Sequence, residues 1–308
     1  MIAAAVGGSE IDDMRVLPLL AVVLVVAAVS GTARASQLID RNAHDVRLAV
    51  NTKGEALLTY RDAGGVKHVL AWDAVNAIAP TRDRQQVEFK LDYAGGWGKY
   101  HRTYWKTFGS ACGAYDGPPL AWLVTACTAP DGSYWAVQAW QRELPNYGVV
   151  PTPRQAVWEL RLSHWTGALP VLSISTDWSW HRWNHLFGTF AYDGTPVFGF
   201  RATSGGNPLD GFGRNVYVDT FNSKYGKGWK RENSFLTHRG TGVFCYSFNP
   251  HGSHPAGRGT KYRATVEGPG VTPDVMWEGR APGAYDRTLD HEANAAIAAL
   301  GDKQCHGN

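Results

Sequence analysis

The segment Val87-Glu88-Phe89-Lys90-Leu91-Asp92-Tyr93 (VEFKLDY) places apolar residues at its odd positions and charged residues at its even positions. Successive side chains of a β-strand point to opposite faces, so this alternation predicts a strand with one buried face and one solvated face. The segment Lys261–Glu267 repeats the pattern, with Tyr262, Ala264 and Val266 on its apolar face. A period of two residues therefore dominates the chain.

Short strands of this kind recur along the sequence, with turn-forming residues such as Asp131-Gly132 and Asp193-Gly194 between them. Further strand candidates are Val46–Val50, Ala56–Arg61, His68–Trp72, Trp122–Thr125, Trp135–Arg142, Val157–His164, Pro170–Thr176, Phe187–Tyr192, Pro196–Ala202, Asn215–Phe221, Val243–Phe248 and Val275–Trp277. One helix is expected at Leu289–Leu300, with Thr288 placed to cap its start. The sequence predicts an all-β, antiparallel fold of the sandwich or jelly-roll type with one short C-terminal helix.

The N-terminal region has the pattern of a secretory signal peptide. Arg15 precedes the apolar run Val16–Val29, and Ala33-Arg34-Ala35 is a small-x-small cleavage signal, so Ser36 is the expected mature N-terminus. The alternative is a membrane anchor, but the apolar run is shorter than the roughly 20 residues that span a bilayer. We expect a secreted protein of bacterial composition, with no membrane span after cleavage and with Met14 as an alternative start.

The predicted domain organisation follows from this signal. Residues 1–35 form the upstream segment and signal peptide, and residues 36–308 form the mature β-rich domain. The segment Cys112–Pro119 is a possible boundary between a small N-terminal β unit, residues 36–111, and a main sandwich, residues 112–308. The mature part carries only a small excess of basic residues, which permits an anionic partner without requiring one.

The chain has four cysteines: Cys112, Cys127, Cys245 and Cys305. An even number in an exported chain predicts disulfides, and four cysteines allow three pairings. We expect the local pairs Cys112–Cys127 and Cys245–Cys305. No two of the cysteines have the C-x2-C spacing that is typical of zinc sites.

All 13 tryptophans lie between Trp72 and Trp277, and they are densest in Asp177–His185. Aromatic rings can stack on the faces of sugar rings while polar side chains reach the hydroxyl groups. If this segment is extended, Trp178, Trp180, Arg182 and Asn184 share one face. They are therefore predicted ligand-binding residues, and the alternative is that these rings belong to the core.

Two other segments interleave aromatic and basic residues. One is Gly95–Lys106, and the other is Arg214–Arg231, from which Tyr225 and Trp229 are added to the predicted ligand-binding residues. Such mixtures suit anionic polymers through charge pairing combined with stacking, and the alternative is solvated loops in which arginine stems cover the rings. Export and the weak net charge argue against nucleic acid, so an acidic wall glycan or a teichoic-type polymer is the better match.

The sequence gives weaker support for a catalytic site or a metal-binding site. A glycoside hydrolase needs two carboxyl groups facing each other across a cleft, and Asp177, Asp219 and Glu232 are the candidates that border aromatic segments. His181, His185, His251 and His254 form two pairs that suggest a metal site, with polar loop histidines as the alternative. Serine-hydrolase, Walker and dinucleotide-binding signatures are absent from the sequence.

Three hypotheses follow. The leading one is a secreted β-sandwich protein that binds a glycan or a cell-surface polymer through exposed aromatic residues and needs no cofactor. The second is a secreted polysaccharide-degrading hydrolase or lyase with acidic catalytic residues. The third is a structural or interaction protein without a small-molecule site. The sequence leaves the ligand and the oligomeric state open.

Overall fold

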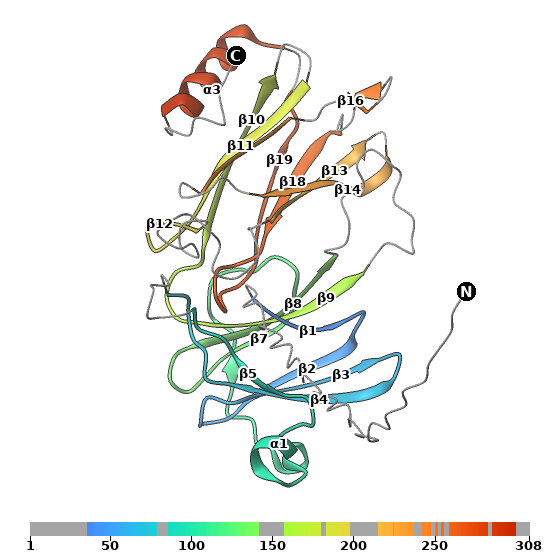
Figure 1. Cartoon of the computed structure of the whole chain (residues 1–308), viewed down its shortest axis with the longest axis vertical. Helices are drawn as coiled ribbons and strands as arrows, with labels where there is room; N and C mark the ends of the chain where they lie inside the picture. The colour runs from blue at the N-terminus through green and yellow to red at the C-terminus, as the bar shows by residue number, and fades with distance from the viewer. Residues whose placement is uncertain are drawn as a thin grey trace, which may run out of the picture. The chain divides into compact units, whose positions relative to one another are not determined.

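Antiparallel strand pairing builds nearly all of the regular structure in the computed structural model of this chain (Figure 1). The structure describes residues 36–78, 86–141, 157–179, 183–197, 215–223, 225–236, 242–247, 250–251, 254–255, 259–282 and 285–299. All of them belong to a compact unit that spans Thr32–Asn308. The prediction of an all-β, antiparallel fold with one short C-terminal helix is confirmed, and the described residues form no closed barrel.

Two of the sheets enclose the first hydrophobic core. The five-stranded sheet has the order β1 (Gln37–Arg41), β9 (Trp158–Trp165), β8 (Tyr134–Gln141), β7 (Leu123–Thr128), β6 (Gly113–Ala114). The second sheet has the order β2 (His44–Val50), β3 (Ala56–Asp62), β4 (Gly65–Trp72), β5 (Lys90–Asp92). Their apolar faces pack together through residues such as Leu58, Val69, Trp135 and Leu160. Residues that precede the Cys112–Pro119 segment in the chain and residues that follow it both contribute to this core.

Two further sheets enclose the second core. One has the order β10 (Val171–Ser179), β11 (Trp183–Tyr192), β12 (Thr195–Pro196), with β15 (Val243–Ser247) paired to β11. The other has the order β14 (Gly226–Leu236), β13 (Asn215–Ser223), β18 (Lys261–Val266), β19 (Val275–Arg280). Leu186, Phe190, Val216 and Phe244 meet in this core. The expected inward residues of β18, Tyr262, Ala264 and Val266, are fully buried.

The remaining elements are short. β16 (Pro250–His251) and β17 (His254–Pro255) form a two-stranded ribbon. α1 (Trp97–Tyr100) and the 3-10 turn η1 (Tyr104–Thr107) follow β5. The C-terminal helix α3 (Arg287–Ala299) contacts β10. Its cap is Asp286, whose Oδ1 accepts the backbone N–H groups of Thr288 and Leu289, so the expectation that Thr288 caps the helix is wrong.

The VEFKLDY segment forms a shorter strand than its pattern predicts. Only Lys90–Asp92 pairs, with β4, although Phe89 is buried on the expected face. Asp92 ends the strand because its Oδ1 accepts the backbone N–H of Ala94 at 2.8 Å and turns the chain. Tyr93 therefore leaves the sheet and is 57% exposed, where the alternation alone predicts that it points inward.

A disulfide joins Cys112 and Cys127, as expected, with the two Cα atoms 5.7 Å apart. Cys112 packs at the margin of the first core, and Cys127 lies on β7 inside that core. Cys245, on β15, is also disulfide-bonded. Cys305 lies outside the described residues.

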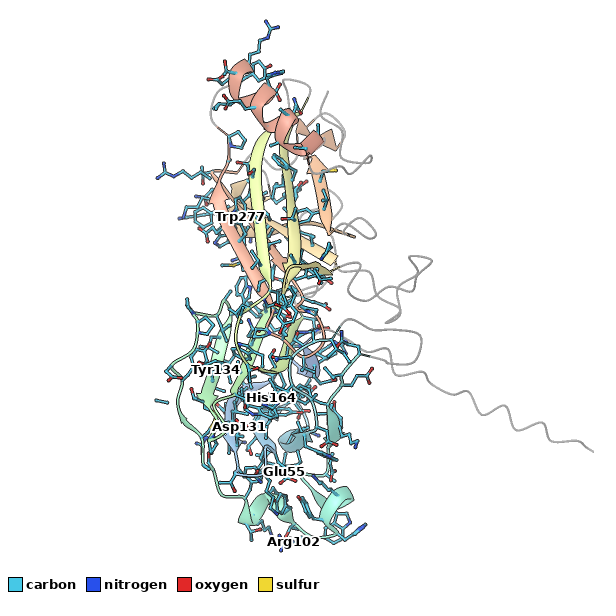
Figure 2. The ribbon with its side chains drawn as sticks, turned by 90° about the vertical axis from the view of Figure 1, so that its left-hand side faces the viewer. Glu55, Arg102, Asp131, Tyr134, His164 and Trp277 are labelled. Carbon is cyan, nitrogen blue, oxygen red and sulfur yellow. A yellow bond between two sulfur atoms is a disulfide. The ribbon has the colours of Figure 1, made fainter. Side chains whose placement is uncertain are left out.

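One buried histidine lies in the first core. His164, on β9, stacks on the ring of Trp135 with centroids 3.8 Å apart. Its Nε2 lies 2.8 Å from Ser133 Oγ, which in turn donates to Asp131, and its Nδ1 contacts the carbonyl oxygen of Ala74 (Figure 2). Burial lowers the pKa of His164 to about 4, although the carbonyl of Ala74 and the charge of Asp131 oppose this shift.

Candidate functional site

The segment from Tyr93 to Phe108, which we call the aromatic–basic loop, is the best-defined candidate for a binding site. It leaves the edge strand β5 and contains α1 and η1 (Figure 1). Trp97 is 52% exposed and Tyr93 is 57% exposed, and these are the two most exposed of the large aromatic residues that the structure describes. Rings this exposed are accessible to a ligand.

Two glycines shape the base of this loop. Gly95 has φ +65° and Gly96 has φ +98°, backbone conformations that residues with a Cβ rarely adopt. A Cβ on Gly96 would also lie 2.7 Å from the Cβ of Tyr104, and one on Gly95 would lie 2.9 Å from the indole of Trp105. The Gly95-Gly96 pair therefore lets the returning η1 turn pack directly on the chain that leaves β5.

A buried carboxylate fastens the loop to the sheet. Glu55 precedes β3 and is almost fully buried, and its Oε1 accepts hydrogen bonds from Lys99 Nζ, at 2.7 Å, and from the hydroxyl of Tyr100. Its Oε2 accepts from the hydroxyl of Tyr104 at 2.9 Å and from Asn51 Nδ2 at 2.8 Å. Three of these four donors belong to the loop. In Figure 2, Glu55 lies between the sheet and the turn that carries Arg102.

The electrostatics of Glu55 show that this anchor is ionised. Burial on its own would raise the pKa of the carboxyl group, but the hydrogen bonds from Lys99, Tyr100, Asn51 and Tyr104 outweigh it and lower the pKa to about 2. The contact with Glu55 has the opposite effect on the pKa of the phenol groups of Tyr100 and Tyr104. Burial and the negative charge of Glu55 raise the pKa of both tyrosines, so they remain neutral donors.

Rings and cations alternate along the loop. Trp105 stacks on His68 of β4 with ring centroids 4.0 Å apart and planes 11° apart. Lys99 Nζ lies 4.3 Å from the ring centroid of Trp72, and the guanidinium of Arg102 lies 5.3 Å from that of Tyr104. Contacts of this kind hold cations beside the faces of rings and limit their conformational freedom. The loop is therefore an ordered surface.

The exposed charges of the loop are positive. Arg102 and Lys106 are exposed, as is His101, whereas the acidic residues Glu55 and Asp92 accept hydrogen bonds from the loop. A flat ring next to exposed cations can stack on a sugar ring while the cations pair with its acidic substituents. Binding of an anionic polymer by the Gly95–Lys106 segment stays a prediction, and none of its residues is among the predicted ligand-binding residues.

The predicted platform at Asp177–His185 is a hairpin instead of one continuous strand. β10 ends at Ser179 and β11 begins at Trp183, and the register pairs Trp178 with Asn184 and Asp177 with His185. Residues directly opposite each other on antiparallel strands share a face, so the backbone brings Trp178 and Asn184 together. The other predicted members, Trp180, His181 and Arg182, lie outside the described residues.

The other two predicted ligand-binding residues, Tyr225 and Trp229, belong to the β13–β14 hairpin. Tyr225 is buried, and burial together with the nearby carboxylate of Glu232 raises its pKa to about 12. Trp229 is half-buried against Phe221. The guanidinium of Arg263 lies 4.4 Å from the ring centroid of Trp229 and 4.3 Å from that of Trp122. Trp229 therefore belongs to a tryptophan–arginine–tryptophan stack.

The structure places two of the predicted catalytic carboxylates inside the fold. Asp219, on β13, accepts from Arg231 Nε at 2.6 Å and from both Nε and a terminal nitrogen of Arg263. Glu232 is also buried, on the neighbouring strand β14. Of Asp177 the structure describes the backbone position on β10. The paired arginines give Asp219 the surroundings of a structural ion pair.

The structure describes the backbones of three of the four predicted metal ligands, and His181 lies outside the described residues. The backbones of His251 and His254 are directly opposite each other in the β16–β17 ribbon, and His185 lies on β11. No group of three or more potential metal ligands occurs among the described residues.

Comparisons with protein-family models, with curated proteins and with solved structures find no significant match to this chain. Within the described ranges, every helix is too short or too polar to cross a membrane.

Sequence reasoning missed the residues that hold the loop in place. Glu55, His68 and Trp72 come from the β3 and β4 region, more than 20 positions before the residues they contact. The only local signal is a carboxylate placed directly after the Lys53-Gly54 turn and before an apolar strand. That signal is weak because many exposed carboxylates follow turns.

Proposed function

We propose that this protein binds an anionic glycan or cell-surface polymer through the aromatic–basic loop. The observation that carries the proposal is the buried anchor beneath an exposed ring: Glu55 holds Lys99, Tyr100 and Tyr104, while Trp97 projects 52% exposed from the same loop. A site that is ordered before binding loses less conformational entropy when it binds. This supports a binding role more than a purely structural one.

The chemistry favours a polymer that combines sugar faces with negative charges. Trp97 and Tyr93 supply rings for stacking, and Arg102, Lys106 and His101 supply exposed donors, of which the first two carry fixed positive charge. Uronic-acid polysaccharides have both features. An anionic polymer also exchanges condensed counterions for the protein's cations, so binding to it should weaken as salt is added.

The test is retention on matched insoluble polymers. Polygalacturonate is the anionic probe, and cellulose is the neutral probe that also consists of pyranose rings. We expect depletion of the protein from solution by polygalacturonate at low salt and little depletion by cellulose. Equal retention on both polymers would show that charge plays no part, and retention on neither would remove the proposal.

Variants locate the site on the surface. Trp97→Ala and Arg102→Ala should each weaken retention on polygalacturonate. Trp158, which is 45% exposed on β9, and Arg47, which is exposed on β2, provide matched control substitutions to alanine. Loss of retention with the control variants alone would place binding elsewhere on the molecule.

A further inference from the structure

Asn51, in the turn between β2 and β3, and Lys99, in α1, contact the same buried carboxylate. Lys99 Nζ donates to Glu55 Oε1 at 2.7 Å, and Asn51 Nδ2 donates to Glu55 Oε2 at 2.8 Å. The side chain of Glu55 is 3% exposed and that of Lys99 is 27% exposed. An amine nitrogen and a carboxamide nitrogen are therefore bound to the two oxygen atoms of one carboxylate, at the position labelled Glu55 in Figure 2.

The hydrogen bonds of Asn51 fix the orientation of its carboxamide. Its Oδ1 accepts the backbone N–H groups of Lys53, at 2.9 Å, and of Glu55, at 3.1 Å. Only the oxygen atom of the amide can accept both, so the nitrogen atom is the one that faces the carboxylate. Two N–H donors on a carbonyl oxygen stabilise the negative charge that forms there when a nucleophile adds to the carbonyl carbon. The carboxamide of Asn51 is therefore oriented as an electrophile.

Aromatic side chains surround the amine of Lys99. Its Nζ lies 4.3 Å from the ring centroid of Trp72 and 5.3 Å from that of Tyr100. The hydroxyl of Tyr104 donates to Glu55 Oε2 and accepts from Asn51 Nδ2 at 3.2 Å. Holding an amine and an amide together in one molecule replaces a bimolecular encounter by an intramolecular step, which lowers the barrier to their reaction.

We propose that Lys99 and Asn51 react to form an intramolecular isopeptide bond, with Glu55 transferring protons between the two nitrogen atoms. Glu55 first accepts a proton from the ammonium group of Lys99. The free amine then attacks Asn51 Cγ and forms the Nζ–Cγ bond, while the electron pair of the C=O bond moves onto Oδ1. Glu55 gives its proton to Nδ2, the C=O bond forms again, the Cγ–Nδ2 bond breaks, and ammonia leaves.

The reaction is balanced without an oxidant, a reductant or a second substrate. Nζ loses one further proton, which converts the departing ammonia into ammonium. Lys99 and Asn51 then share one secondary amide, and Glu55 ends as the carboxylate that it was at the start. The hydrogen bonds that lower the pKa of Glu55 to about 2 make it a weak base, so we expect a slow reaction that occurs once in each molecule.

The bond ties the aromatic–basic loop covalently to the turn before β3. This inference goes beyond the proposed binding function and does not depend on it, because the ion pair and the amide both hold the loop against the sheet. Retention on a polymer and formation of the bond are measured separately, so the failure of one leaves the other standing.

The test is the mass of the intact protein. After incubation at neutral pH and reduction of the disulfides, we expect the natural protein to be lighter by one ammonia molecule than the chain with the same N-terminus. Digestion with trypsin should give one branched peptide that contains both Asn51 and Lys99, because trypsin does not cleave after a lysine whose amine is acylated. Lys99→Arg keeps the positive charge but lacks the amine, and it should have the full mass. Lys106→Arg, at an exposed position of η1, is the matched control and should lose ammonia.

The variant also separates the bond from a side reaction. Asparagine can lose ammonia by forming a succinimide ring with the following backbone nitrogen, and that ring would form in Lys99→Arg as well. Loss of ammonia that persists in this variant, with no branched peptide from the natural protein, would overturn the proposal. Full mass of the natural protein after incubation would overturn it too. If Lys99→Arg fails to fold, the presence or absence of the branched peptide in the natural protein decides the question alone.

Discussion

Lys99 Nζ lies 2.7 Å from Glu55 Oε1, although the two residues are 44 positions apart in the chain. The pair joins the aromatic–basic loop to the start of β3, and the side chain of Glu55 is almost fully buried while that of Lys99 is 27% exposed. Glu55 accepts hydrogen bonds from four donors, three of them in the loop. Leaving this buried carboxylate without its donors would cost free energy, so the loop and the sheet stabilise each other. This ion pair therefore supports the loop that carries the exposed rings.

Glu55→Gln should destabilise the protein and loosen the loop. The amide keeps the shape of the side chain but removes the charge that accepts from Lys99, Tyr100 and Tyr104. We expect a loss of about 2–4 kcal/mol in the free energy of unfolding, measured by urea denaturation. Glu292→Gln, at an exposed position of α3, is the control and should change stability by less than about 0.5 kcal/mol. Equal stability of the two variants would contradict the anchoring role.

Gly96→Ala should disrupt the loop through the backbone. The residue has φ +98°, and its new Cβ would meet Tyr104 at 2.7 Å. We therefore expect loss of retention on polygalacturonate together with faster proteolysis within the loop. Gly109→Ala is the control, because nothing lies within 4 Å of its Cβ position and its φ is not in the left-handed region. Normal retention by the Gly96 variant would show that the loop conformation is not needed for binding.

Stability should fall as the pH decreases from about 6.5 to about 4 because of His164. Its folded pKa, about 4, is below the ordinary histidine pKa of about 6.5, so the unfolded chain binds the proton first and unfolding is favoured in that interval. The expected change is about 3 kcal/mol. His164→Gln should flatten this part of the profile of unfolding free energy against pH. An unchanged slope in the variant would mean that other groups control it.

Replacing Cys112 and Cys127 together by serine should destabilise the folded protein. The disulfide closes a loop with a sequence separation of 15, for which the chain-entropy estimate is about 3 kcal/mol. Urea denaturation under oxidising conditions measures the loss. The same double variant should show no additional loss when a reductant is added, apart from the effect on Cys245. A stability equal to that of the unmodified protein would show that the loop is ordered without the bond.

Local patterns predicted the fold class well because strand periodicity is a property of neighbouring residues. The alternation in Lys261–Glu267 and the pairing of Cys112 with Cys127 are examples that the structure confirms. The end of the VEFKLDY strand was missed because one side-chain hydrogen bond, from the Ala94 N–H to Asp92, overrides the pattern.

The candidate site was less predictable because its contacts are distant in sequence. The composition of Gly95–Lys106 indicated a binding segment, yet nothing near it in the sequence pointed to Glu55 as its anchor. The charge of Asp219 suggested catalysis, whereas its two arginine partners come from β14 and β18. The residue types therefore indicated which charged and aromatic groups are present, but their partners could not be predicted because these lie far away in the sequence.

The most direct test of the central claim is the affinity of the protein for soluble oligogalacturonate, measured by titration calorimetry at low salt with the unmodified protein, Trp97→Ala and Trp158→Ala. The binding account predicts a Kd roughly three- to tenfold weaker for Trp97→Ala, which corresponds to the loss of one stacking contact, and an unchanged Kd for Trp158→Ala. The same Kd for all three proteins, or no binding by any of them, would contradict it.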